Sequence, residues 1–225
     1  GSFIGIAKNI LAPGEYCVGP SLSYTAPAGS PAYQNGNEPF GNLSIALNAL
    51  QTQGCNGHIT FVLQNNYTGT AGAPNFTQEN NPISIAYQGD VSRTLTITSR
   101  TDNTSPILIQ NTKANGVGII EFNGARYVYL RGSINNVCGD YGIKIQNNAS
   151  YSLNFAPGYS NCISFKNDTR HVTVSGVQFE VADRGINFDN NAASQGSDSI
   201  MISCNKFMVR ADLMNTNCYP FGIAF

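Results

Sequence analysis

Apolar and polar residues alternate at period two through much of this chain, in short runs separated by polar turns. The clearest run is EFNGARYVYLRGSI at residues 121–134. Similar blocks return at residues 164–180 and, with a longer middle, at residues 187–207. Each block has an aromatic residue, a polar turn, an alternating apolar pair and a tight turn. Because period two is the signature of a β-strand, each block predicts short strands joined by turns.

A second, shorter theme predicts how these strands are stacked. The segments GIKI (142–145), CISF (162–165), GINF (185–188) and GIAF (222–225) share one apolar pattern. Counted from Phe122, their last residues fall at Ile145, Phe165, Phe188 and Phe225, in steps of about 23, 20, 23 and 37 residues, within the range of stacked repeats. The Leu-x-x-Leu-x-Leu frame of leucine-rich repeats is absent. The pattern therefore predicts a right-handed parallel β-helix, an all-β solenoid with coils of about 20 to 23 residues stacked about 4.8 Å apart.

The N-terminal part predicts one helix among further strands. Residues 42–53 place four apolar residues at helical spacing, with Asn42 or Ser44 able to cap the start and Gly54 the end. We expect this helix to cap the first coil, with residues 1–57 forming an N-terminal strand, loop and capping helix and residues 58–225 the coils. Because Phe225 ends an apolar strand, we expect the stack to continue in further chain or in a partner. Further strands are predicted at residues 16–18, 58–63, 83–86, 95–98 and 107–110.

Composition narrows the possible settings of such a solenoid. Only 11% of the 225 residues are charged, against about 25% in ordinary domains. The net charge of −1 gives no basic surface for nucleic acid, and no run approaches the roughly 18 apolar residues of a transmembrane helix. We therefore expect neither a nucleic-acid partner nor a transmembrane segment.

Six cysteines in this weakly charged chain predict an oxidising, extracellular location. Without a Cys-x-x-Cys pair and with two histidines, the chain predicts no zinc site, and we expect no cofactor. Fifteen pairings are possible, and proximity along the chain favours three of them. These are Cys17–Cys55, Cys138–Cys162 and Cys204–Cys218.

Several segments together resemble a known group of proteins. GEYCVG, NLSIALNALQTQGCNGHITFVLQNNYTG, LTITSRTDNTSPILIQ and GIIEFNGARYVYLRGSI are similar to the N-terminal part of secreted right-handed parallel β-helix surface proteins of Bacteroidota-type bacteria. The resemblance extends from about residue 14 to residue 207. It implies export and attachment to the cell surface, and it carries no particular activity.

Candidate binding residues stand out on one predicted strand. Tyr127, Tyr129 and Arg131 alternate with apolar residues, so they point outward as a possible ligand or partner face, unless a loop covers them. We expect an extracellular structural or adhesive module of a cell-surface or filament-forming protein, able to associate end to end with copies of itself. The alternative is a polysaccharide-binding domain, or a polysaccharide-degrading lyase or glycoside hydrolase.

The degrading alternative requires carboxylates that converge from adjacent coils within about 10 Å. We expect no catalytic residue, because the charges in the densest stretch look scattered along the turns. That stretch contains Asp168, Arg170, His171, Glu180, Asp183, Arg184 and Asp189.

Overall fold

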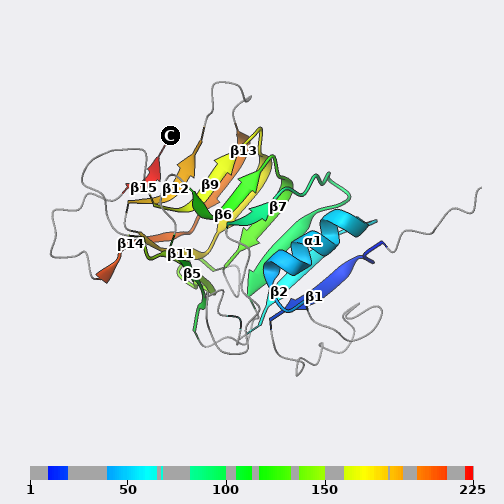
Figure 1. Cartoon of the computed structure of the whole chain (residues 1–225), viewed down its shortest axis with the longest axis horizontal. Coiled ribbons are helices and arrows are strands. Elements are labelled where there is room, and N and C mark those ends of the chain that lie inside the picture. The colour runs from blue at the N-terminus through cyan, green and yellow to red at the C-terminus, as the bar shows by residue number, and fades with distance from the viewer. Residues whose placement is uncertain are drawn as a thin grey trace, which may run out of the picture.

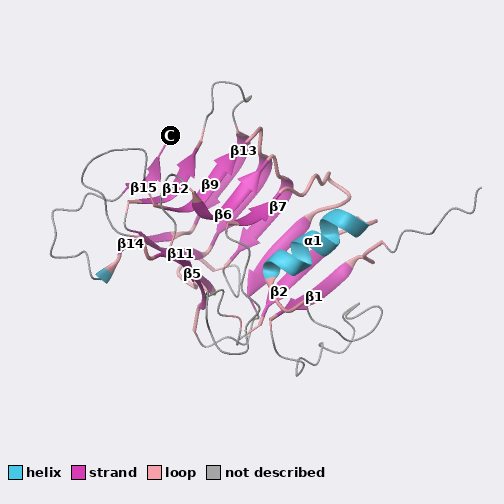
Figure 2. Ribbon diagram, in the orientation of Figure 1, coloured by secondary structure: helices cyan, strands magenta, loops and turns pink. Residues whose placement is uncertain are grey.

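The computed structural model describes residues 10–19, 40–64, 67, 82–99, 105–112, 117–132, 137–149, 160–181, 183–189, 197–211 and 221–224. Strands dominate these residues, with a single α-helix among them (Figure 2). The elements are β1 (Gly14–Val18), α1 (Leu43–Gln53), β2 (Ile59–Leu63), β3 (Ile83–Ile85), β4 (Leu95–Ser99), β5 (Ile107–Asn111), β6 (Gly118–Asn123), β7 (Arg126–Arg131), β8 (Ile143–Asn147), β9 (Asn161–Lys166), β10 (Arg170–Ser175), β11 (Val177–Val181), β12 (Arg184–Phe188), β13 (Asp198–Ser203), β14 (Lys206–Val209) and β15 (Phe221–Ala224).

The strands form three sheets in which neighbouring strands are parallel (Figure 1). The first sheet has the order β1-β2-β4-β7-β10-β13, the second β5-β8-β11-β14, and the third β3-β6-β9-β12-β15. From β3 onward the chain visits the third, first and second sheets in turn. This is the parallel β-helix predicted from the alternating pattern, and the strands predicted between residues 16 and 110 are confirmed.

The register places equivalent residues of successive coils directly on one another. In the third sheet Phe122, Phe165 and Phe188 pair across β6, β9 and β12, and their rings stack with centroids 5.0 and 4.9 Å apart. In the second sheet Phe179 stacks on Phe207 at 4.9 Å. The core therefore consists of columns of apolar side chains, one contributed by each coil.

The predicted coil of about 20 to 23 residues is wrong for most of the stack. Phe122 pairs directly with Phe165, so the step through Ile145 is not a full coil. Ile145 lies in β8 of the second sheet, where it pairs with Phe179. Among the predicted steps between Phe122 and Phe188, only the one from Phe165 to Phe188 is one coil. The short apolar theme recurs in two different sheets because all of the sheets bury alternate residues.

Helix α1 begins and ends where the sequence predicts. The Asn42 side chain accepts a hydrogen bond from the backbone N–H of Ile45 at 2.8 Å, and Gly54, at a φ of 77°, donates its N–H to the carbonyl of Leu50. The helix lies at the end of the stack that contains β1 and β2 (Figure 1). It follows β1 in the chain, so it covers an end of the core without being the first element. The side chains that it buries in the common core are Leu43, Ala46, Leu47 and Leu50.

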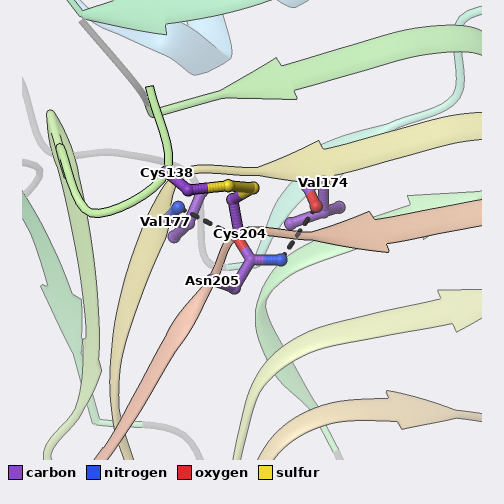
Figure 3. Close-up of a disulfide and its surroundings, with 5 residues drawn as sticks. All are labelled: Cys138, Val174, Val177, Cys204 and Asn205. Carbon is purple, nitrogen blue, oxygen red and sulfur yellow. Dashed lines mark hydrogen bonds between the residues drawn. A yellow bond between two sulfur atoms is a disulfide. The ribbon is translucent and has the colours of Figure 1, made fainter. Parts of the chain in front are cut away.

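A disulfide joins Cys138 to Cys204, which are 66 residues apart in the chain (Figure 3). Cys138 lies between β7 and β8, and Cys204 follows β13 two coils later. The coil between them turns at Gly176. Its neighbour Ser175 pairs with Ser203, so Gly176 lies level with Cys204. Closing a loop of this length in the unfolded chain stabilises the fold by about 4 kcal/mol in the chain-entropy account. This bond therefore ties together three successive coils.

The predicted cysteine pairings are wrong where the structure describes them. Cys138 and Cys204 bond to each other, so neither forms its predicted bond with Cys162 or Cys218. Cys55 is a thiol, which excludes Cys17–Cys55, and Cys162 is a buried thiol. Cys218 lies outside the described residues. The predictions failed because stacking brings together residues that are far apart in the chain.

The residue after Cys204 completes this corner of the coil. Asn205 donates from its side-chain nitrogen to the carbonyl of Val174 at 2.8 Å, and its side-chain oxygen accepts from the backbone N–H of Val177 at 2.9 Å (Figure 3). It thereby satisfies both backbone groups that flank the tight turn at Gly176, whose φ is 65°. In the coil before, a Cβ on Gly132 would collide with the carbonyl oxygen of Gly176, so this corner requires glycine there.

The phenylalanine column leads to a stability prediction. Replacing Phe165 by Ala removes the middle ring and leaves a cavity between Phe122 and Phe188. We therefore expect the free energy of unfolding to fall by about 3 to 5 kcal/mol. Urea unfolding followed by circular dichroism measures this difference. Met201→Ala is the control, because Met201 is 60% exposed and its loss should cost less than about 0.5 kcal/mol. Equal effects of the two substitutions would contradict the stacked core.

Candidate functional site

The outer face of the first sheet carries the predicted aromatic and basic residues. In β7, Val128 and Leu130 are fully buried, whereas Tyr129 is half-buried and Arg131 is exposed. The Arg131 guanidinium lies over the Tyr129 ring, with Cζ 4.9 Å from the centroid. The alternation predicted from the sequence therefore places Tyr129 and Arg131 on the outside, in contact with each other.

A column of polar and aromatic residues runs along one rim of this sheet. Strand register aligns one residue from each coil, immediately before the first buried residue of each strand. His58 and Thr94 are hydrogen-bonded at 2.9 Å, and Tyr127 stacks on His171 with ring centroids 4.6 Å apart. We call this set the rim column. Its members are His58, Thr94, Tyr127, His171 and Ser199.

The backbone of the rim column is unusual. Tyr127, His171 and Ser199 have φ angles of 56°, 52° and 52°, in the left-handed region that non-glycine residues seldom adopt. Each such residue costs about 1 to 3 kcal/mol, and such geometry is concentrated at functional sites. Its repetition in three successive coils indicates that the surrounding stack imposes it. The geometry presents the Tyr127 and His171 rings together at the surface.

Charged residues next to the rim column form an alternating ladder. Asp168 accepts from Arg126 Nη2 at 3.0 Å and from Arg170 Nε at 2.6 Å. Arg170 Nε also lies 3.4 Å from a carboxylate oxygen of Asp198 in the next coil. Two arginines and two carboxylates therefore balance one another and link the coils that contain β7, β10 and β13.

The remaining charges of the densest stretch are spread over other parts of the stack. Glu180 lies on the second sheet, 2.5 Å from Lys144 of the neighbouring strand. Asp183 accepts hydrogen bonds from the backbone N–H and hydroxyl of Ser160 at 2.9 and 2.8 Å. Of these seven residues, His171 belongs to the rim column and Asp168 and Arg170 lie beside it. The seven residues of this stretch therefore do not form one convergent cluster.

Two pairs of carboxylates from different coils do approach a common cation. Glu121 and Asp189 lie 2.5 and 4.0 Å from the ammonium of Lys166, on the third sheet. Asp168 and Asp198 share Arg170 in the same way. In both places a basic side chain occupies the space between the acids, which is where a hydrolase would hold its substrate.

The Cys162 thiol and the Tyr87 phenol have structural roles. Burial raises the pKa of Cys162 to about 12, and its thiol faces the carbonyls of Ile145 and Glu180. Burial and contact with Cys55 raise the pKa of Tyr87, whose hydroxyl donates to the carbonyl of Arg93 at 2.9 Å. No group of three or more metal-ligating side chains occurs in the described part of the chain. No helix there is long and apolar enough to span a membrane.

Sequence reasoning identified Tyr127, Tyr129 and Arg131 but not the partners of Tyr127. The signal was present, because aligning the repeated segments RYV (126–128) and RHV (170–172) places Tyr127 opposite His171. In comparisons with protein families, curated proteins and solved structures, no match to this chain was found.

The Cys162 environment predicts low reactivity. At about pH 8, the folded protein should be alkylated at Cys162 at least about a thousandfold more slowly than the unfolded chain, because burial suppresses the reactive thiolate. Mass spectrometry after timed alkylation measures the rate. Cys55, which is partly exposed, is the internal control and should react in the folded state. Labelling of Cys162 at the rate of Cys55 would contradict its assignment as an inert structural thiol.

Proposed function

We propose that this chain is an extracellular structural and adhesive module: a rigid β-helix that displays the outer face of its first sheet to a partner. The observation that carries the proposal is how the charged side chains are used. Ion pairs link Lys144 to Glu180, Lys166 to Glu121 and Arg126 to Asp168, each between neighbouring coils. These ion pairs link the coils to one another, and the rings of Tyr127, Tyr129 and His171 remain partly or fully exposed on the first sheet.

The disulfide and the resemblance support an extracellular location. A bond between Cys138 and Cys204 persists in oxidising environments and is rare in reducing ones. Similarity to secreted surface β-helix proteins of Bacteroidota-type bacteria suggests display at the cell surface. Rigid rods of this kind can carry an adhesive face away from the cell or form part of a filament.

End-to-end association is part of the proposal. β13, β14 and β15 are the last described strands of the three sheets. The outer edges of strands pair readily with further strands. The apolar Ile223 is 37% exposed in β15, which gives the described core apolar surface on this side that suits contact with a second copy.

Polysaccharide degradation is the second candidate. The approach of Asp168 to Asp198, and of Glu121 to Asp189, favours it. The cation between each pair favours binding without cleavage, because a hydrolase needs a free acid and a free base or nucleophile on opposite sides of the bond. Adhesion is therefore the preferred function.

The test measures binding and cleavage of the same polymers. A panel of extracellular polysaccharides is screened by affinity electrophoresis and by the release of new chain ends. We expect binding without cleavage, weakened about tenfold or more in a Tyr127→Asn, Tyr129→Thr double variant. Asn tolerates the left-handed backbone of position 127, and Thr matches the residues on both sides of Tyr129 in its column, Thr96 and Thr173.

Tyr141→Ala is the matched control. Tyr141 lies beside Lys206 of the second sheet, so its replacement should leave binding unchanged. Release of chain ends would favour the enzymatic candidate. Absence of binding together with a strictly monomeric species in light scattering would contradict both the adhesive and the self-associating parts of the proposal.

A further inference from the structure

We propose that the outer face of the first sheet binds an acidic polysaccharide, with Arg131 pairing to a carboxylate of the sugar chain. This inference rests on the proposed adhesive function and names the chemistry of its ligand. The binding surface comprises Tyr127, Tyr129, Arg131, His171 and Thr173.

Arg131 is set apart from the other arginines of this region. Arg126 and Arg170 are engaged by Asp168, and Arg93 is paired with Asp90. Arg131 is exposed and forms no ion pair with any residue that the structure describes. A guanidinium presents two parallel N–H groups to a carboxylate, and the pair gains strength from the charge on both partners.

The described residues around Arg131 include no competing anion. Along β7, β10 and β13, the outward positions beyond the rim column hold no carboxylate. Glu15 occupies the corresponding face of the first sheet in β1, three strands away from β7. The charged ladder at the rim is balanced by its own arginines and carboxylates. In the part of the face that the structure describes, Arg131 is therefore the one guanidinium without a carboxylate partner, and its ring contact with Tyr129 orients it.

The same face offers hydroxyl groups at regular intervals. Thr98 and Ser175 flank Arg131 in neighbouring strands, and Thr96 and Thr173 flank Tyr129. Neighbouring strands lie about 4.8 Å apart, so these hydroxyls recur along the stack at a fixed spacing. A polysaccharide that carries hydroxyls on every unit can use such a row of donors and acceptors.

The aromatic rings indicate a sugar chain more than a protein partner. The Tyr127 and His171 rings stack on each other, and the Arg131 guanidinium lies over the Tyr129 ring. Amphipathic rings contact the apolar faces of sugars while their polar atoms remain hydrated. Protein interfaces have apolar centres, whereas the face here is lined with hydroxyls and charge. Acidic sugars match both the rings and the guanidinium.

The experiment compares two forms of one polymer by calorimetry. The first probe is a polyuronate, and the second is the same polymer with its carboxylates reduced to alcohols. We expect the wild-type protein to bind the polyuronate at least about tenfold more tightly than the reduced polymer, the size expected for one charge-assisted hydrogen-bonded contact. Arg131→Gln should abolish that preference, and Arg131→Lys should restore part of it because it keeps the charge without the fork.

Arg93→Gln is the matched control, since it removes one surface arginine that Asp90 already pairs and that is not part of the proposed binding surface, and it should change affinity less than about twofold. Equal losses in the Arg131 and Arg93 variants would overturn the proposal in favour of non-specific charge attraction. Equal binding of the two polymers would overturn the acidic ligand while leaving adhesion intact. The acidic ligand would also be overturned if the protein bound neither polymer but bound a neutral polysaccharide of the panel through Tyr127 and Tyr129.

Discussion

The structure depends on the in-register parallel stacking of successive coils. Strands about 4.8 Å apart place each residue directly on its equivalent in the next coil. In the core, this constraint allows identical side chains to stack on one another, as in the column of Phe122, Phe165 and Phe188. Outside, like charges in one column would repel, and the aligned Arg126 and Arg170 are bridged by Asp168. Other charged residues meet an opposite charge diagonally, on the neighbouring strand. Lys144 with Glu180 and Lys166 with Glu121 are the results.

The same constraint explains how a chain with so few charged residues builds a stable surface and a distinct face. Charged residues are used in pairs that bind coil to coil, and Asn205 closes a corner by bonding to the backbone of the preceding coil. The outer face of the first sheet is different, because it carries aromatic rings, hydroxyls and the exposed Arg131. Its rim column adds a repeated left-handed backbone. This contrast supports the assignment of that face as the binding surface.

Period two predicted most of the strands, the caps Asn42 and Gly54 predicted the helix, and the recurrence of the short apolar theme predicted the stacked coils of a parallel β-helix. Coil length could not be read from the short theme ending at Ile145 and Phe165, because both positions are buried in the same alternating way in different sheets. The disulfide partners could not be found from proximity in the chain, since Cys138 meets Cys204 across an intervening coil. Tyr127 was recognisable from its own strand, but its stack on His171 depends on register between coils.

The most direct test of this account is the identification of the disulfide in the non-reduced protein by proteolysis and mass spectrometry. Coil stacking predicts a linked pair of peptides containing Cys138 and Cys204, with Cys162 recovered as a thiol. In the observed register the strand that ends at Ser175 lies between those that precede these two cysteines, so the stacking of three coils brings them together. A bond from Cys138 to Cys162, or from Cys204 to Cys218, would contradict the register on which the core, the charge ladders and the binding face all depend.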